Sequence, residues 1–224
     1  MGIAVLPLHR PVRHAQGLRC SCGKGDCESP AKHPFAKLVA HGLRDASKDQ
    51  TVVASWFENS ELNVGIATGT VSGIVALDID PRHGGDEALA ALEREHGPLA
   101  NTWRFLTGGG GEHIIFRHPG KTVSNSAGKI GPGIDMRGDG GYIVAPPSMH
   151  ISGRRYAISV DHHPDDIALA PLPGWLLAAL RRPADKRSRR KRLPNGGIRW
   201  RASSSKASAI VPWQASPDIC SATA

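Results

Sequence analysis

The stretch Gly73-Ile74-Val75-Ala76-Leu77-Asp78-Ile79-Asp80 decides the fold of this chain, because it is an apolar run that ends in two closely spaced carboxylates. Such a run predicts a buried β-strand, in which residues two apart project from the same face. Asp78 and Asp80 are therefore expected side by side. The opposite face of the strand is expected to bury Val75, Leu77 and Ile79.

The two carboxylates indicate a site for a divalent cation. Adjacent carboxylates repel each other, and a hard cation such as Mg2+ or Mn2+ neutralises both. Pro81 and the glycines at 84 and 85 end the strand directly after the pair, which leaves the carboxylates at a rim that a substrate can approach. Acidic residues also end strands without any chemical role, so the pair by itself leaves both interpretations open.

A glycine-rich hairpin is predicted further along the chain. Residues 102–107 and 112–117 have the composition of two strands, and the glycine run 108–111 joins them. The second strand places His113 and Arg117 on one face. Glycines let a backbone approach a phosphate closely, so His113 at this turn is a candidate ligand for a polyphosphate. The glycine run is equally typical of a flexible turn.

A third carboxylate lies on the next predicted strand. Residues 131–148 place Asp135 and Arg137 on one face, turn tightly at 139–141, and continue as a strand over 142–145 that ends at two prolines. Two-metal phosphoryl transfer requires such a set of carboxylates, histidine and arginine, because carboxylates hold the ions and cationic side chains bind the triphosphate.

The order and spacing of several motifs resemble a known family. The motifs are Val5-Leu6-Pro7-Leu8, Lys32-His33-Pro34, Asn63-Val64-Gly65-Ile66-Ala67-Thr68-Gly69, Leu77-Asp78-Ile79-Asp80, Gly109-Gly110-Gly111-Glu112-His113 and the long segment 133–148. From about Gly2 to Leu180 the chain resembles the bifunctional DNA primase/polymerase (prim-pol) domain of plasmids and phages, in the archaeo-eukaryotic primase superfamily.

This resemblance implies a fold, an activity and a set of partners. The implied fold is α+β, with an RNA-recognition-motif-like core. The implied activity is template-directed nucleotidyl transfer by a DNA primase and polymerase in the replication of a mobile element, and its partners are a single-stranded DNA template and nucleoside triphosphates. Carried over to this sequence, Asp78, Asp80 and Asp135 are the carboxylates for Mg2+ or Mn2+. His113 and Arg137 are the nucleotide-phosphate ligands.

The chain departs from the family pattern at both ends. Members usually carry a helix before the Val5-Leu6-Pro7-Leu8 strand, whereas Met1 here begins almost on that strand. Many members also continue into a helicase, and no P-loop pattern is present in this sequence. We therefore expect any helicase partner to be a separate protein.

Cysteines cluster near the N-terminus in the pattern Cys20-x-Cys22-x4-Cys27-x5-His33. Three thiolates and one imidazole can close a tetrahedral zinc site of the structural type, here within a loop of about residues 18–36. His41 is a spare fourth ligand. A disulfide or unrelated free thiols are the alternatives, but an odd number of clustered cysteines cannot pair fully, and no signal peptide precedes them. We therefore expect structural Zn2+ and a cytoplasmic location.

The positive charge of the chain lies in its tail. The formal net charge is +8, and residues 181–224 hold 11 Lys and Arg against Asp185 and Asp218, a net +9, while the other 180 residues hold 17 basic and 18 acidic residues. We expect a catalytic domain over residues 1–182 and a disordered basic tail over 183–224. The tail either binds phosphate backbones through counterion release or is the remnant of a lost C-terminal domain. No apolar run approaches the ~20 residues of a membrane span, so no membrane partner is expected.

Three helices complete the α+β prediction. The segment Ser47-Lys48-Asp49-Gln50 has the pattern of a capping box that opens the first helix. Its core-facing residues are expected to be Val52, Val53, Trp56 and Phe57. Residues 86–96 predict a second helix that ends at Gly97, and residues 175–182 predict a third. Strands and helices in this order indicate an α+β sheet that carries helices.

Two other functions would use the same features. A catalytically idle DNA-binding remnant of a replication protein would need only the zinc loop and the basic tail. A repair-type polymerase or a metal-dependent nuclease would need the same carboxylates. An unused site would have no chemical reason to keep three carboxylates and a histidine, so the primase and polymerase function is the leading interpretation.

Overall fold

The computed structural model describes residues 2–58 and 60–181. The basic tail predicted over 183–224 lies outside these residues. None of the helices within the described part is long and apolar enough to cross a membrane.

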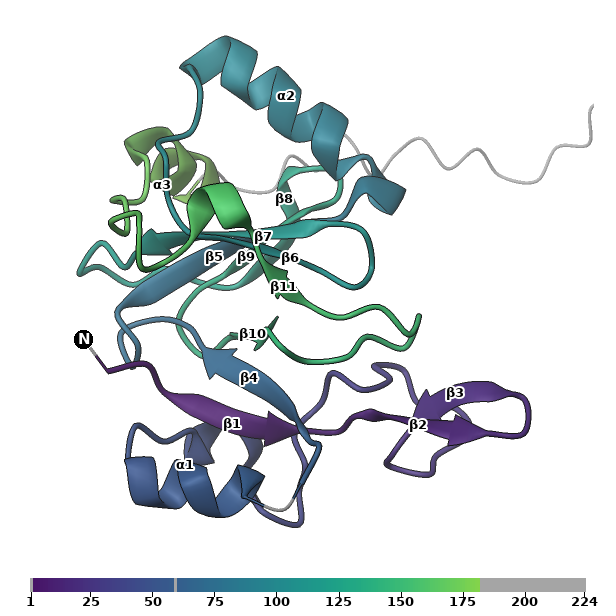
Figure 1. Ribbon diagram of the computed structural model, residues 1–224. Coiled ribbons are helices and arrows are strands. Elements are labelled where there is room, and N and C mark those ends of the chain that lie inside the picture. The colour runs from purple at the N-terminus through teal and green to yellow at the C-terminus, as the bar shows by residue number, and fades with distance from the viewer. Residues whose placement is uncertain (1, 59, 182–224) are drawn as a thin grey trace, which may run out of the picture. The chain divides into compact units, whose positions relative to one another are not determined.

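An antiparallel six-stranded sheet forms the centre of the domain (Figure 1). Its middle strands are β7 (Glu112–Arg117), β5 (Ile74–Ile79) and β9 (Ile134–Arg137), in that spatial order. The remaining strands are β11 (Ala157–Ile158) and β6 (Arg104–Leu106) beside β7, and β8 (Ser126–Gly131) beside β9. The hairpin predicted around the glycine run is therefore confirmed, because β6 and β7 pair antiparallel.

A second, three-stranded antiparallel sheet packs against the first. Its strands are β1 (Val5–Leu8), β4 (Asn63–Ala67) and β10 (Tyr142–Ala145), with β4 in the middle. The short hairpin of β2 (Pro11–His14) and β3 (Gly17–Cys20) projects from the end of β1 (Figure 1). Cys20, the first predicted zinc ligand, is the last residue of this hairpin.

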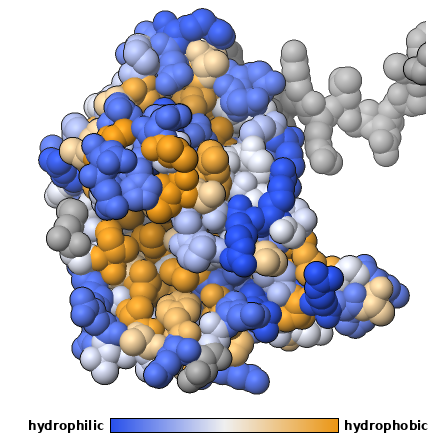
Figure 2. Space-filling view, in the orientation of Figure 1, coloured by the Kyte–Doolittle hydropathy of each residue, from blue (hydrophilic) through white to orange (hydrophobic). Residues whose placement is uncertain are grey.

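Helices cover the outer faces of the two sheets (Figure 1). Helices α2 (Gly85–His96) and α3 (Gly174–Arg181) lie on the six-stranded sheet, and α1 (Gln50–Phe57) lies beside β1. Leu89 of α2 and Leu176 of α3 are buried against this sheet, and the outward side of α2 is hydrophilic at the top of Figure 2. The α+β class is thus confirmed, with both long faces of the central sheet covered.

Strand β5 is buried on both faces because helices α2 and α3 pack on one face of the sheet and the three-stranded sheet packs on the other. The predicted inward residues Val75, Leu77 and Ile79 all join the core under α2 and α3, as expected. Ile74 and Ala76, on the other face, are 1% and 0% exposed in the core between the two sheets. The face that carries Asp78 is therefore apolar along most of its length and becomes polar only at its end.

The first helix differs from its prediction at the cap. Its N-cap is Asp49, whose carboxylate accepts hydrogen bonds from the N–H groups of Thr51 and Val52. Ser47 instead accepts the N–H of Asp49, so the predicted Ser47 capping box is wrong. Val52, expected to face inward, is 39% exposed, whereas Trp56 is buried. The helix starts at Gln50, two residues later than a Ser47 cap implies.

The other two helices agree with their predictions within one residue. Helix α2 begins at Gly85 and ends at the predicted Gly97 cap. Its residues Ala88, Leu89 and Leu92 pack on the core between the helix and the sheet. Helix α3 spans the residues expected near the end of the domain.

Candidate active site and metal cluster

Three predicted site residues form a row across the central sheet. In the antiparallel register, Asp78 of β5 lies opposite His113 of β7 on one side and opposite Asp135 of β9 on the other. Residues that are directly opposite on neighbouring strands project from the same face within about 5 Å of each other at Cβ. The register therefore brings together residues that are up to 57 positions apart in the chain.

The row faces a cleft between the two sheets with a volume of about 660 Å³. All five residues predicted for catalysis and nucleotide binding line this cleft: Asp78, Asp80, His113, Asp135 and Arg137. The opposite wall comes from β10 and from the loop after it, through Tyr142, Ile143, Val144 and Tyr156. The cleft thus has one ionisable wall and one largely apolar and aromatic wall.

Arg137 lies between two of the carboxylates. Its Nη2 donates to Oδ2 of Asp135 at 3.0 Å and to Oδ2 of Asp78 at 3.2 Å. One cationic group thus bridges both acids and leaves the three side chains with a net charge of −1; the side chains of Asp78 and Asp135 are 29% and 28% exposed. Asp78 and Asp135 thus already bind one positively charged group, the Arg137 guanidinium. Hard divalent cations prefer carboxylate oxygens, so these two side chains also fit such a cation.

The prediction that Asp80 lies on the strand beside Asp78 is wrong, because Asp80 lies just after the strand. Strand β5 ends at Ile79, and Asp80 caps the 3-10 helix η2 (Pro81–His83) with an extended backbone of φ −112° and ψ 103°. Its carboxylate accepts from Nε and Nη2 of Arg82 and contacts Nδ1 of His83 at 3.0 Å. The hydrogen bonds from the Arg82 side chain hold the pKa of Asp80 well below its usual range. Asp80 is therefore ionised and engaged by Arg82 and His83 of its own turn.

His113 lies in the buried part of the cleft. It is 5% exposed, and burial lowers its pKa, although the nearby Asp78 raises it. Its Nε2 lies 3.6 Å from Oδ1 of Asp78, and its ring lies beside that of Tyr156. Among the residues that the structure describes, Nδ1 of His113 is buried without a hydrogen-bond partner. An unpaired buried nitrogen of this kind fits a site whose ligand completes its hydrogen bonding.

The glycine run between β6 and β7 is held by packing at both ends. A Cβ on Gly111 would lie 2.0 Å from the carbonyl oxygen of Ile79, and a Cβ on Gly108 would lie 2.2 Å from Cβ of His150. Gly110 adopts φ +96°, which a side chain rarely allows. Gly109 and Gly111 line the cleft. The glycines therefore serve the close approach of this loop to Ile79 and His150, and their contact with a phosphate stays a prediction.

Asp139 lies near the site but has a structural role. Its carboxylate accepts the N–H groups of Thr70 and Val123, both at 2.9 Å, and contacts Nε2 of His118 at 3.2 Å. Burial raises the pKa of Asp139, but these hydrogen bonds outweigh it and lower the pKa to about 2. The tight turn predicted here is present, with Gly140 at φ +71°. Asp139 thus joins three segments behind the cleft.

The predicted zinc ligands come together as one cluster. The ligand atoms of Cys20, Cys22, Cys27 and His33 all lie within 4.8 Å of one another, and Sγ of Cys20 is 3.4 Å from Nε2 of His33. Within residues 2–58 and 60–181 it is the only such group of three or more His, Cys, Asp or Glu residues. The spare ligand His41 instead contacts Asp45. The cluster could therefore hold a metal, and its thiolate-rich donor set suits zinc.

The thiols of the cluster differ in their readiness to ionise. A hydrogen bond from the backbone of Lys24 lowers the pKa of Cys22 to about 7. Burial raises the pKa of Cys27 to about 11. Because a metal binds the thiolate, loading of the cluster releases protons and is favoured by higher pH.

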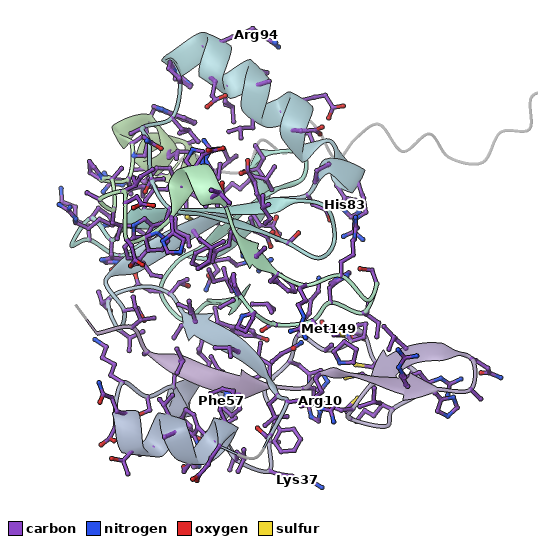
Figure 3. All side chains as sticks on the ribbon, in the orientation of Figure 1. Arg10, Lys37, Phe57, His83, Arg94 and Met149 are labelled. Atoms are coloured by element: carbon purple, nitrogen blue, oxygen red, sulfur yellow. The ribbon has the colours of Figure 1, made fainter. Side chains whose placement is uncertain are left out.

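The structure adds residues to the cleft that the sequence analysis did not assign. Lys32 lines it from the metal loop, and Arg82 and His83 line it from the turn after β5. Figure 3 labels His83 at this turn. Burial lowers the pKa of Lys32, while the opposing charge of Asp78 raises it. The sequence signal that could have identified these residues is their position beside predicted ligands. Lys32 directly precedes the predicted metal ligand His33, and Arg82 follows Asp80 by two residues.

The comparison with protein families agrees with these features. The model of the N-terminal domain of bifunctional DNA primase/polymerase (Prim-Pol) matches residues 1–175. The match covers more than three quarters of the chain, so the chain belongs to this family. Members of the family are enzymes, and membership implies DNA primase and polymerase activity with DNA and nucleotides as substrates. Among curated proteins, no sequence matches this chain.

Proposed function

We propose that this enzyme makes or extends primers on single-stranded DNA, using the cleft between the two sheets as its active site. The observation that carries the proposal is the row of His113, Asp78 and Asp135 across three neighbouring strands, with Arg137 between the carboxylates. The sheet of β5, β7 and β9 with helices on its outer face supports an RNA-recognition-motif-like core. Replication of a mobile element, with a separate helicase, is the setting that the family resemblance favours.

The carboxylates are the proposed ligands of the catalytic cations. Asp78 and Asp135 hold a cation already, in the form of the Arg137 guanidinium, and Asp80 lines the same cleft. Bound Mg2+ or Mn2+ would supply the Lewis acid that activates the primer hydroxyl and neutralises the leaving pyrophosphate. For Asp80 to take part, its carboxylate must exchange the hydrogen bonds from Arg82 for a metal bond.

Arg137 and His113 are the proposed ligands of the triphosphate. The guanidinium of Arg137 has a geometry that suits phosphate oxygens, and it is free to turn toward them when another cation neutralises the carboxylates. His113 is neutral and buried, so it contributes a hydrogen bond and not a charge. The Cys20, Cys22, Cys27 and His33 cluster is the proposed structural Zn2+ site.

A primer-extension assay tests the assignment. Purified protein is incubated with single-stranded template, nucleotides and Mg2+ or Mn2+, with and without a primer. Asp78→Asn, Asp80→Asn and Asp135→Asn should each lower the incorporation rate by orders of magnitude, because each removes a charge from the cation site. Asp86→Asn, on the exposed start of α2, is the matched control and should retain the wild-type rate.

The outcomes separate the alternatives. Template binding should survive in all the active-site variants if these residues serve chemistry and not DNA affinity. Full incorporation by an Asp78→Ala, Asp80→Ala double variant would show that the chemistry lies elsewhere. Template binding by a wild-type protein that incorporates nothing would favour the DNA-binding remnant. Extension that strictly needs a primer would favour the repair-type polymerase.

A further inference from the structure

We propose that Lys32 is a triphosphate-binding residue of the nucleotide site, and that the Cys3His metal cluster holds it in place. The inference rests on the proposed function of the cleft and extends it to a residue of the metal loop. It joins two features that are separate in the sequence analysis, the catalytic wall and the zinc motif.

The charges of the cleft single out Lys32. Arg137 is engaged with Asp78 and Asp135, and Arg82 is engaged with Asp80. Lys32 lines the same cleft and is partly buried, but within the described part of the chain it belongs to no ion pair. A cation that no carboxylate engages, next to a proposed phosphate site, is available to an incoming polyanion.

The backbone around Lys32 is anchored on both sides. Ala31 is 1% exposed at φ 62°, a conformation that a non-glycine residue adopts only where its surroundings hold it. Its carbonyl accepts Nδ2 of Asn63 at 2.9 Å. The carbonyl of Lys32 accepts the hydroxyl of Tyr142 at 3.0 Å, and that tyrosine also lines the cleft. The lysine thus has a long side chain on a fixed base.

The metal cluster supplies the second set of anchors. The N–H of Ala31 donates to Sγ of Cys20 at 3.2 Å, and His33 belongs to the cluster itself. The residues directly before and after Lys32 are therefore tied to ligand atoms of the same cluster. Metal binding fixes those atoms relative to one another, so loss of the metal should release Lys32 from the cleft before it affects the sheets.

Equilibrium nucleotide binding tests the proposal independently of turnover. The full chain with its metal is titrated with dATP and, separately, with deoxyadenosine, both in Mg2+ and without template. Lys32→Met should weaken dATP binding about tenfold to a hundredfold, as the loss of a charge-assisted bond implies, and should leave deoxyadenosine binding within about twofold. Lys32→Arg should restore much of the loss, since it keeps the charge.

Lys37→Met is the matched control. Lys37 lies just after the metal loop, is exposed, and points away from the domain at the bottom of Figure 3. This variant should bind dATP as the wild type does. In the polymerase assay, Lys32→Met should raise the KM for nucleotides much more than it lowers kcat. An unchanged dATP affinity in Lys32→Met, or an equal loss in Lys37→Met, overturns the proposal.

A double-variant cycle tests the link to the metal. Cys27→Ser should weaken dATP binding in the same direction as Lys32→Met, and the double variant should lose little more than either single one, because both act through one contact. Circular dichroism and thermal unfolding confirm that each variant is folded. Additive losses would refute the role of the cluster.

The result also separates this proposal from the proposed function. If the wild type incorporates nucleotides and Lys32→Met binds dATP normally, only the role of Lys32 fails. If the wild type binds dATP through Lys32 but incorporates nothing, the polymerase assignment of the cleft fails and the nucleotide site remains.

Discussion

Asn63 joins the metal loop to the three-stranded sheet, and its replacement should be costly. The side chain is 2% exposed at the start of β4. Its Nδ2 donates to the carbonyls of Ala31 at 2.9 Å and Met149 at 2.8 Å, and its Oδ1 accepts the N–H of Met149 at 2.9 Å. One amide thus satisfies three backbone groups on two segments that are far apart in sequence.

The size of the effect follows from these three bonds. Asn63→Ala removes all of them and leaves two carbonyls and one N–H without their partner. A net hydrogen bond is worth about 1 kcal/mol, and a buried unpaired group costs more, so the free energy of unfolding should fall by about 3 to 4 kcal/mol. For a domain of this size the melting temperature should fall by about 10 °C.

Urea denaturation followed by tryptophan fluorescence measures this loss directly. The midpoint should shift while the denaturant slope stays the same, because the exposed surface on unfolding is unchanged. Asn101→Ala, at an exposed position, is the control and should change stability by less than about 0.5 kcal/mol. A loss below about 1 kcal/mol for Asn63→Ala would refute the view that this amide holds the loop.

Three further predictions concern the loop, the cluster and the turn behind the cleft. Gly111→Ala should destabilise the protein by about 2 kcal/mol, since an added methyl overlaps a neighbouring carbonyl, whereas Gly174→Ala, where nothing lies within 4 Å, should not; thermal unfolding of both decides this. Purified protein should contain about one zinc, and Cys27→Ser should lose it; elemental analysis that finds no metal in wild-type protein purified without chelators contradicts the prediction. The lowered pKa of Asp139 means that the folded state favours its ionised form. Its contribution to the free energy of unfolding, up to about 2 kcal/mol, is therefore complete above about pH 4 and is lost as the pH falls toward 2. The stability difference between wild type and Asp139→Asn should shrink over that pH range, and a difference that is constant with pH speaks against it.

Much of the fold follows from local sequence pattern. The alternation in 112–117 and 134–137 predicted both the strands and the faces that their side chains occupy, because the period of two is a property of any strand. Helix α2 was predicted within one residue, since its inward leucines and its Gly97 stop lie close together in sequence. Where two signals compete locally the prediction failed, as for the caps Ser47 and Asp49, which lie only two residues apart.

The candidate site divides in the same way. The metal cluster is local, with its four ligands within 14 positions, so their spacing alone predicted that they could meet. The candidate acids were identified from their residue type and from the strand face on which each was predicted to lie. Their meeting at Asp78 depended on which strands are neighbours, and the order β7, β5, β9 is not encoded in any single segment.

The sequence by itself determined the strands around 74–79, 102–117 and 134–145, the faces that carry the candidate acids, the Cys3His cluster and the family. Only the tertiary structure decided that β10 and the metal loop line the cleft, that Arg137 lies between two carboxylates, and that Lys32 lines the same cleft. Those facts depend on contacts between residues as many as 110 positions apart, such as that of Tyr142 with Lys32. Local periodicity carries no information about contacts between residues so far apart in sequence. Those contacts follow from how the two whole sheets pack to bury their apolar surface.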